Sequence, residues 1–342
     1  MGKLSIFRLL RNQMKSFPPP KKYDLAGKTV LVVGANVGIG FEVAKHFARM
    51  QPGKLIVTAR NAAKGEATVA TIQKETGYKN VHSRILELSS FASVTAFAEA
   101  FEKEEERLDL YVYNAGMSSM KYEPTGDGWE STLQVNDLSC TLLSLLLLPR
   151  LLESAKTSAT RPRMVIVASE VHFWITVNDV ERASPRILDK ANDKEYCESG
   201  AMRRRYFFSK MLNVMFAREL TARLPADTPL IVDCVNPGFC SSELGRNGPR
   251  ILRALAYLVG LIVARTPEQG SRQLIWAALG GSEKEDELKG AYVSDHGVEE
   301  PSDFLLSEQG AKDQKRILDE IIETLSSVNP NVKPIVDKYL TK

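Results

Sequence analysis

The chain has 342 residues, of which 44% are hydrophobic and 25% charged. These proportions are close to the globular average and exclude a disordered, collagen-like or coiled-coil chain. Lysine and arginine number 45 against 42 acidic residues, a net charge of +3, which is too small an excess for a nucleic-acid binder that relies on phosphate neutralisation. We therefore expect a globular protein whose partner is a small molecule and not a nucleic acid.

The N-terminal residues 1–26 form a basic amphipathic extension. Six lysines and arginines precede the first acid, Asp24, and apolar residues recur at helical spacing at Phe7, Leu10, Met14 and Phe17. One interpretation is a helix on an anionic membrane surface; the other, which we favour, is a helix packed on the protein or a loose extension. Basic residues interrupt the apolar positions, so a secretory signal is not expected. We expect a cytoplasmic protein, with peripheral membrane association as the alternative.

Beyond residue 27, short apolar, mostly β-branched runs alternate with stretches of helical period. The predicted strands are Val30–Val33, Leu55–Thr58, Val81–Leu86, Leu108–Tyr113, Met164–Ala168, Leu230–Val235 and Ala291–Ser294. The predicted helices are Phe41–Met50, Ala62–Lys74, Ser90–Glu106, Thr132–Ser154, Arg203–Leu224 and Pro267–Leu279. Alternation of this kind implies parallel strands joined by helical crossovers. The predicted fold is α/β, a single Rossmann-type doubly wound sheet with helices on both faces.

This predicted domain spans residues 27–300 and is followed by a helical appendage over 301–342, in which Ala311–Val328 has a 3.6-residue apolar period. No run of about 18 apolar residues occurs, so a membrane-spanning helix is not expected. The four cysteines contain no Cys-x-x-Cys pair and the four histidines are scattered. Neither a disulfide framework nor a metal site is predicted.

A glycine-rich loop lies where the first predicted strand ends and the first helix begins. Glycines at such a junction permit a tight turn, and they let a pyrophosphate approach free N–H groups at the positive end of the helix dipole. We predict that the loop binds a dinucleotide through Gly34, Asn36, Val37, Gly38, Ile39 and Gly40.

The end of the second predicted strand indicates which dinucleotide is bound. It reads Thr58-Ala59-Arg60-Asn61, and no acid occurs before Glu66. An acid there would bind a ribose 2′-hydroxyl and repel a 2′-phosphate, whereas Arg60, with Lys64, can pair with phosphate oxygens. The prediction is NADP(H) in preference to NAD(H). The alternative is that Arg60 is an ordinary solvated arginine.

Tyr206 is the only tyrosine with a lysine, Lys210, four residues later. On a helix the two side chains share a face. A phenol has a pKa of about 10, so it needs nearby positive charge to exchange protons near neutral pH. Lys210 would supply part of that charge and an oxidised nicotinamide would add more. The pair is therefore a candidate acid/base centre.

Together these residues resemble the short-chain dehydrogenase/reductase family over about residues 27–295. The glycine motif matches from Gly34 onward, with Val33 where the family usually has threonine, and Tyr113-Asn114-Ala115-Gly116 resembles the family's Asn-Asn-Ala-Gly. Asn236-Pro237-Gly238 resembles the Pro-Gly turn beside the nicotinamide. The resemblance is nearest to the retinol-dehydrogenase-like branch and to fungal secondary-metabolite tailoring reductases. It adds these cofactor contacts: Glu87, Leu88, Asn114, Ala115, Gly116, Tyr206, Lys210, Pro237 and Gly238.

The resemblance also implies a catalytic tetrad of Asn136, Ser169, Tyr206 and Lys210. Tyr206 would donate a proton to the alkoxide formed by hydride transfer, and Ser169 would hold the carbonyl oxygen. Lys210 would stabilise the tyrosinate and hold the nicotinamide ribose, while Asn136 would hold a water that links Lys210 to solvent. Alternatively, Asn136 bonds only helix backbone and Ser169 is an ordinary turn residue.

Two segments are expected to shape the substrate site. An insertion over about 170–205 begins with His172, Phe173 and Trp174, which either line or roof the site or pack in the core. Its last residues, Arg203-Arg204-Arg205, are expected to form a solvated face. The second segment, about 239–266, contains the apolar helix Ile251–Ala264, which would cap the pocket or dip into a membrane interface.

An apolar lid favours a lipophilic carbonyl or alcohol, such as a retinoid, a steroid, or a polyketide or terpenoid intermediate. The predicted function is thus an NADP(H)-dependent oxidoreductase that interconverts a ketone or aldehyde and an alcohol. The alternatives are a non-catalytic NADPH-binding sensor or scaffold, and a peripheral membrane protein anchored by residues 1–17. Family members often pair through helices matching Thr132–Ser154 and Arg203–Leu224, faces that the chain-end extensions could cover here.

Overall fold

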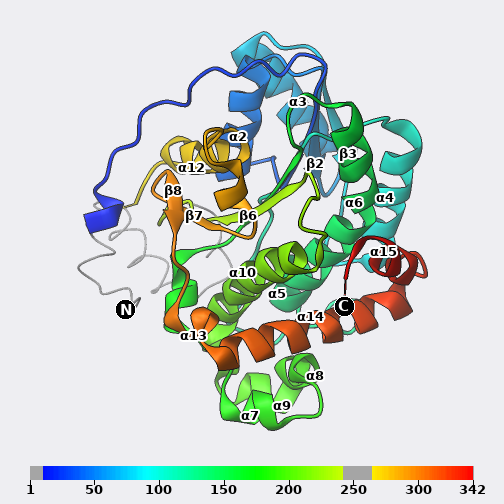
Figure 1. The fold of residues 1–342 in the computed structure, drawn as a ribbon, viewed down its shortest axis with the longest axis vertical. Coiled ribbons are helices and arrows are strands. Elements are labelled where there is room, and N and C mark those ends of the chain that lie inside the picture. Colours follow the sequence, from blue (N-terminus) through cyan, green and yellow to red (C-terminus); the bar gives the residue numbers. More distant parts are fainter. Residues whose placement is uncertain (1–10, 242–263, 342) are drawn as a thin grey trace.

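The computed structural model describes residues 11–241 and 264–341, and an eight-stranded sheet runs through it (Figure 1). Its order is β3-β2-β1-β4-β5-β6-β7-β8. The strands are β1 Thr29–Val33, β2 Lys54–Ala59, β3 Val81–Ile85, β4 Leu110–Tyr113, β5 Arg163–Val167, β6 Ile231–Val235, β7 Tyr292–Ser294 and β8 Gly297–Glu299. The first seven are parallel, and β8 pairs antiparallel with β7. The predicted doubly wound α/β fold is confirmed, and β8 is an antiparallel edge strand that was not predicted.

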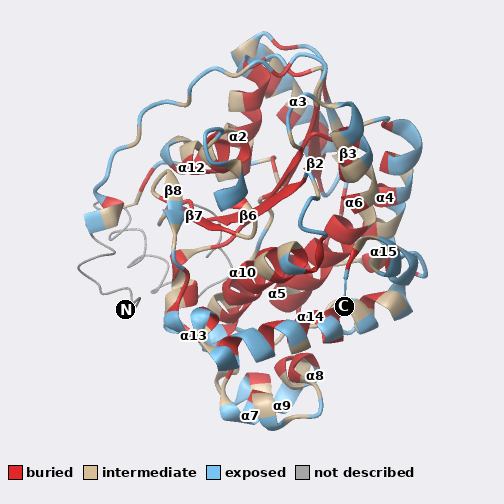
Figure 2. Ribbon diagram, viewed as in Figure 1, coloured by how far each residue is buried: buried red, intermediate tan, exposed pale blue. Residues whose placement is uncertain are grey.

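The central strands are buried on both faces because helices cover each side of the sheet (Figure 2). In β1, Val30 and Val32 pack into one core, while Leu31 and Val33 pack into the other. The first core lies under α2 (Gly38–Arg49), α3 (Ala62–Thr76) and α12 (Pro267–Leu279), and the second under α4 (Phe91–Glu104), α6 (Ser139–Thr157) and α10 (Arg205–Arg223). This two-sided burial explains why the strands read as continuous apolar runs.

The predicted helix Thr132–Ser154 is divided in the structure. A short α5 (Ser131–Leu133) leads into a π-helical turn, η1 (Gln134–Leu138), which continues into α6. Of the described residues, only the stretch Ser131–Thr157 is long and apolar enough to cross a membrane, and 72% of its most apolar part is buried in the protein. Such burial is typical of a core helix.

The insertion and the C-terminal segment pack against each other. The insertion contains η2 (Glu170–Trp174), α7 (Asp179–Ala183), α8 (Ile187–Asn192), α9 (Lys194–Glu198) and η3 (Ala201–Arg204). The C-terminal segment contains α13 (Asp303–Leu306), α14 (Glu308–Val328) and α15 (Val332–Tyr339). A further short helix, η5 (Glu285–Leu288), precedes β7. In Figure 1, α7 to α9 lie on the side of α14 that faces away from the sheet. Helix α14 also packs on α10, so the C-terminal segment joins the second core.

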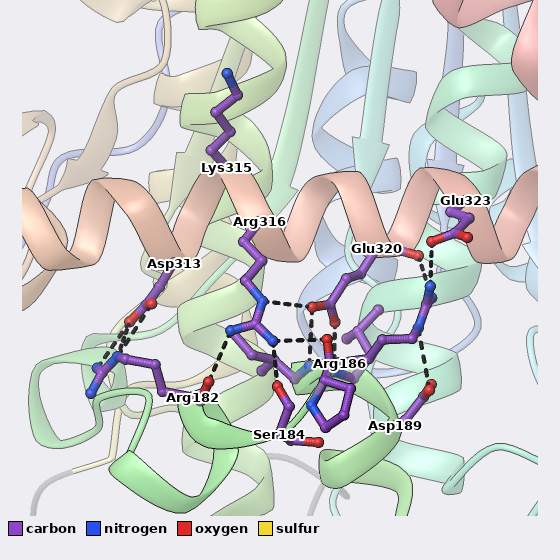
Figure 3. A network of polar contacts seen from close by, with 12 residues as sticks. Arg182, Ser184, Arg186, Asp189, Asp313, Lys315, Arg316, Glu320 and Glu323 are labelled. Atoms are coloured by element: carbon purple, nitrogen blue, oxygen red, sulfur yellow. Dashed lines mark hydrogen bonds and ion pairs between the residues drawn. The ribbon is translucent and has the colours of Figure 1, made fainter.

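Arginine side chains fasten the insertion to α14 (Figure 3). Arg182 donates to both carboxylate oxygens of Asp313, and Arg316 donates to the backbone oxygens of Arg182 and Ser184. The carboxylate of Glu320 accepts from the N–H groups of Ile187 and Leu188 at 3.1 and 2.9 Å, which satisfies the start of α8. The insertion is therefore held in place over α10, whose first turns carry the candidate acid/base pair.

Candidate active site

The loop between β1 and α2 has the geometry of an anion-binding helix start. Gly34 and Gly38 have φ of +80° and +65°, a conformation that side chains disfavour. A Cβ on Gly34 would lie 2.7 Å from Cα of Ala115. All residues of helix α2 are described, and its N-cap, Val37, forms no side-chain hydrogen bond to the backbone N–H groups that follow. The first turn of α2 contains no acidic residue. Its N–H groups are thus available to a pyrophosphate.

Neighbouring strands hold this loop. The N–H of Gly34 donates to Oγ1 of Thr58 at 3.1 Å, and the side-chain amide of Asn114 donates to the Gly34 carbonyl at 2.9 Å. Asn36 and Ile39 are half-buried on the same loop. Gly40 has no room for a side chain because its Cβ would overlap the Gly34 carbonyl oxygen. The predicted loop residues and Asn114 to Gly116 therefore lie together at the carboxyl ends of β1 and β4.

Arg60 lies directly after β2 and is exposed. Among the described residues, Arg60 has no ion-pair partner. Lys64 is also exposed, in the first turn of α3, where its N–H donates to the N-cap Asn61 at 3.0 Å. Both cations are therefore free to meet an anion at the end of β2.

Glu87 and Leu88 follow β3. The Glu87 carboxylate oxygen Oε1 accepts from the N–H and the hydroxyl of Ser89, at 3.0 and 2.9 Å. That oxygen is engaged in a local turn, although the side chain is only half-buried. Leu88 packs in the core below. Contact of Glu87 with an adenine stays a prediction.

The π-helical turn η1 positions Asn136. Its amide group contacts the loop after β4: Oδ1 accepts from Met117 N at 2.8 Å, and Nδ2 donates to Met117 O at 2.9 Å. The same nitrogen donates to Oγ of Ser209 at 2.9 Å. The buried Tyr113, which replaces the family's first asparagine, donates its hydroxyl to Val135 O at 2.6 Å. Asn136 thus fastens the loop that follows the predicted cofactor wall.

The structure brings Ser169, Tyr206 and Lys210 together. Ser169 follows β5, and its side chain lies within hydrogen-bonding reach of the Tyr206 hydroxyl. Lys210 lies one turn further along α10, with Nζ 5.8 Å from the centre of the Tyr206 ring and donating to Val167 O at 2.6 Å. A Cβ on Gly116 would be 3.7 Å from that Nζ. The ammonium therefore faces the predicted cofactor wall as well as the tyrosine.

Burial perturbs both members of the pair. It raises the pKa of Tyr206 above its usual value, and the hydrogen bond with Ser169 opposes this shift. Burial lowers the pKa of Lys210 to about 8, while the nearby charge of Asp137 opposes that shift. That Lys210 and an oxidised nicotinamide together lower the phenol pKa stays a prediction, because the groups that shift it here are burial, Ser169 and Cys240. In this state Tyr206 is a protonated donor.

The predicted Pro-Gly turn follows β6. Gly238, with φ of +79°, donates its N–H to Oδ1 of Asn236 at 3.0 Å, and the same oxygen accepts from Glu170 N at 3.3 Å. Asn236 therefore links this turn to the segment that carries Ser169. Pro237 O accepts from the Arg265 guanidinium at 3.2 Å, so the turn is held from both sides.

The N-terminal segment 11–17 packs against this turn. The Gln13 amide donates to Phe239 O at 2.5 Å and accepts from Phe239 N at 3.1 Å. Lys15 forms an ion pair with Asp295 at 2.6 Å. For these residues the structure supports packing on the protein. The preceding residues 1–10 and the predicted apolar helix Ile251–Ala264, except its last residue, lie outside the described residues.

The three aromatic residues at the start of the insertion, His172, Phe173 and Trp174, differ in how far they are buried. His172 is fully buried: Nδ1 lies 2.8 Å from Ser169 O, and Nε2 accepts from Ser302 N at 3.2 Å. It packs in the core and does not line a substrate site. Phe173 is partly buried against the same core. Trp174 is 41% exposed, with its ring 6.0 Å from that of Phe207.

The expectation for Arg205 was wrong. Arg203 and Arg204 are exposed as predicted, but Arg205 is buried and forms an ion pair with the buried Glu130 at 3.2 Å. Its guanidinium also donates to Ala191 O in the insertion. Position in the fold explains the difference, because the first turn of α10 lies under the insertion.

Asp137 and Asn213 are site residues that were not predicted from the sequence. Both are buried, and the Asn213 amide contacts Asp137, Asn136 and Lys210. The three-residue spacing from Lys210 to Asn213 was a visible signal, since it places both on one helix face. The π-helical turn that completes the contact had no such signal.

Comparisons with known proteins agree with this geometry. The family described as short chain dehydrogenase matches residues 28–173. The short chain dehydrogenase/reductase dmxR8 of Cryptosporiopsis sp. is 35% identical over 93% of this chain and 96% of its own length. The short chain dehydrogenase sol3 of Alternaria solani is 38% identical over 82% and 94%. A short-chain dehydrogenase from Sphingobium yanoikuyae, solved in complex with NADPH, has a TM-score of 0.53 at 22% identity, covering 72% of this chain and 82% of its own.

Proposed function

The chain belongs to the short-chain dehydrogenase/reductase family, and we propose that it is an NADP(H)-dependent oxidoreductase that interconverts a ketone or aldehyde and an alcohol on a lipophilic small molecule. Family membership makes it an oxidoreductase that uses a nicotinamide cofactor on a small molecule. The proposal of carbonyl–alcohol chemistry rests on one observation: Ser169, Tyr206 and Lys210 lie close together beside the glycine loop and the Pro-Gly turn.

The residues present fit a dinucleotide. The uncapped start of α2 would hold the pyrophosphate, the wall from Asn114 to Gly116 would flank the cofactor, and Lys210 would hold the nicotinamide ribose. The bound cofactor supplies or accepts a hydride. Arg60, directly after β2, and Lys64, in the first turn of α3, are both exposed and would bind a 2′-phosphate. This pair supports NADP(H) over NAD(H).

In the reductive direction, the chain must protonate an oxygen on which negative charge develops. Tyr206 donates that proton: a phenol is protonated at neutral pH, and burial raises the pKa of Tyr206 further. Ser169, within reach of the same hydroxyl, holds the carbonyl oxygen. Lys210 stabilises the tyrosinate that remains. In the oxidative direction Tyr206 is the base.

Lipophilic substrates are supported by the surface next to this centre. The exposed ring of Trp174 lies beside Phe207, the residue after Tyr206. The segment expected to cap the pocket, between Phe239 and Thr266, is rich in apolar residues in the sequence. A retinoid, a steroid, or a polyketide or terpenoid intermediate would suit such a surface.

A panel of lipophilic ketones and aldehydes, scanned for loss of NADPH absorbance, tests the proposal. Tyr206→Phe should abolish turnover of any substrate found while NADPH still binds, because only the transferable proton is removed. Retained turnover would remove Tyr206 from its role. NADPH binding without turnover of any carbonyl or alcohol would instead favour a non-catalytic sensor.

A further inference from the structure

The side-chain amide of Asn213 bridges the lysine of the candidate site to the π-helical turn. Asn213 is 2% exposed and lies one turn after Lys210 on α10. Its Oδ1 accepts from Lys210 Nζ at 3.0 Å. Its Nδ2 donates to the backbone oxygen of Asn136 at 2.8 Å and to Oδ1 of Asp137 at 3.2 Å. Both donors and the acceptor of the amide are therefore engaged.

The wide turn η1 presents the two acceptors that Asn213 uses. Within it, Ser139 N–H bonds to Gln134 O, five residues back, where an α-helix would bond four back. Asn136 O and the Asp137 carboxylate both face α10 there. The Asn213 amide therefore connects Lys210 with the backbone of Asn136. That Asn136 holds a water linking Lys210 to solvent stays a prediction.

Asp137 is a buried acid: burial raises its pKa well above the usual value, and the charge of Lys210 opposes that shift. It is 2% exposed, and its second oxygen, Oδ2, has no hydrogen-bond partner among the described residues. The nearby cations are Lys210 and Arg205. Arg205 already pairs with Glu130 at 3.2 Å. Lys210 is therefore the available cation that favours the ionised form of Asp137, and the Asn213 amide bonds both side chains.

We propose that Asn213 is a positioning residue for the reaction: its amide, anchored by Asp137, holds the Lys210 ammonium in its charged form and aims it at the cofactor wall. The proposal deepens the proposed function and rests on it. An ammonium has three N–H groups. Val167 O and Asn213 Oδ1 accept two of them, which leaves the third for the side of Gly116, where the glycine keeps the approach open.

The expected consequence concerns the charge of Lys210. A neutral acceptor bonded to an ammonium favours the charged form, and so does a nearby carboxylate. Burial already lowers the pKa of Lys210 to about 8, so losing either partner lowers it further. The titratable groups that face Lys210 are Asp137 on η1, Cys140 on α6 and Cys234 on β6, besides Tyr206 on its own helix. Those that face Asp137 also include Arg205 and Glu130.

The experiment compares Asn213→Ala and Asp137→Asn with the wild type. The control is Asn329→Ala, which removes an equally buried amide at the end of α14 that bonds Thr95 and Asn331. Two quantities are measured from pH 6 to 9: kcat with a carbonyl substrate, and the NADPH dissociation constant by fluorescence. Thermal melting shows whether each variant is folded.

For Asn213→Ala we expect the basic limb of kcat to move down by about one pH unit, the effect of losing one hydrogen bond to a charged group. NADPH affinity should weaken most above pH 8. Asp137→Asn keeps the shape and should move both curves in the same direction, whereas Asn329→Ala should leave both in place. A uniform loss of kcat with an unmoved pH profile would overturn the role of Asn213.

Asp137→Asn keeps the proposal testable should Asn213→Ala not fold. A folded Asp137→Asn with wild-type pH profiles would overturn the anchoring. If the wild type reduces no carbonyl, the proposed function fails, but the pH dependence of NADPH affinity still decides the role of Asn213. The two failures are therefore distinguishable.

Discussion

Arg60→Ala should weaken NADPH binding without affecting NADH. Arg60 is exposed and, among the described residues, has no ion-pair partner, so its removal leaves no buried charge and disturbs no packing. A hydrogen bond between charged groups contributes about 1.5–3 kcal/mol, and solvent screening of an exposed arginine favours the lower end. About 1.5 kcal/mol corresponds to roughly a tenfold rise in Kd for NADPH.

The assay is NADPH and NADH fluorescence titration of the wild type, Arg60→Ala and Lys64→Ala, at low and at moderate salt. Lys74→Ala is the matched control, because Lys74 is an exposed lysine at the far end of the same helix, α3. The NADPH preference of the wild type should shrink as salt rises, since salt screens exposed charges. An equal loss of NADPH and NADH affinity in Arg60→Ala, or no loss in either, would refute a role in binding the 2′-phosphate.

Two further variants test the packing around the site. Gln13→Ala should lower the free energy of unfolding by about 1–2 kcal/mol, measured by urea titration, because two hydrogen bonds to Phe239 are lost. The control Met14→Ala, at an 84% exposed position, should leave the free energy of unfolding unchanged. Equal effects of the two variants would count against the packing of the N-terminal segment. Burial lowers the pKa of His172 from 6.5 to about 4. The contribution of the neutral ring to the free energy of unfolding, up to about 3 kcal/mol, is therefore fully present above pH 6.5 and is lost as the pH falls toward 4. Relative to the wild type, His172→Gln should therefore gain stability between pH 7.5 and 4.5, and a constant difference in melting would contradict that burial.

The parallel strands were predictable because burial on both faces demands continuous apolar, β-branched runs. All seven predicted strands occur within one or two residues of their expected ends. The antiparallel β8 was missed because its three residues, Gly297 to Glu299, carry no alternation that distinguishes a strand from a turn. The helices α7 to α9 were missed because each is short and charged, and they depend on α14 for their packing.

The candidate site was predictable where its residues lie at strand ends or on one helix face. Because β1 and β5 are parallel, the glycine loop and Ser169 lie at the same, carboxyl-terminal end of the strands. The four-residue spacing places Tyr206 and Lys210 on one face of α10. The π-helical turn was not predictable, because Gln134 to Leu138 contains no proline or glycine that would mark a change of helix type. What surrounds Lys210 therefore had to come from the structure.

The same burial has opposite effects on the two requirements of carbonyl reduction. The proposed reduction needs Tyr206 protonated and Lys210 charged, and a low-dielectric surrounding favours the neutral form of each. It therefore helps the tyrosine and hinders the lysine. The oxygens of Val167 and Asn213 and the charge of Asp137 all act on the lysine and all favour its charged form. Because these polar groups gather around Lys210, the site can keep a buried cation one helical turn from a partly buried, protonated phenol.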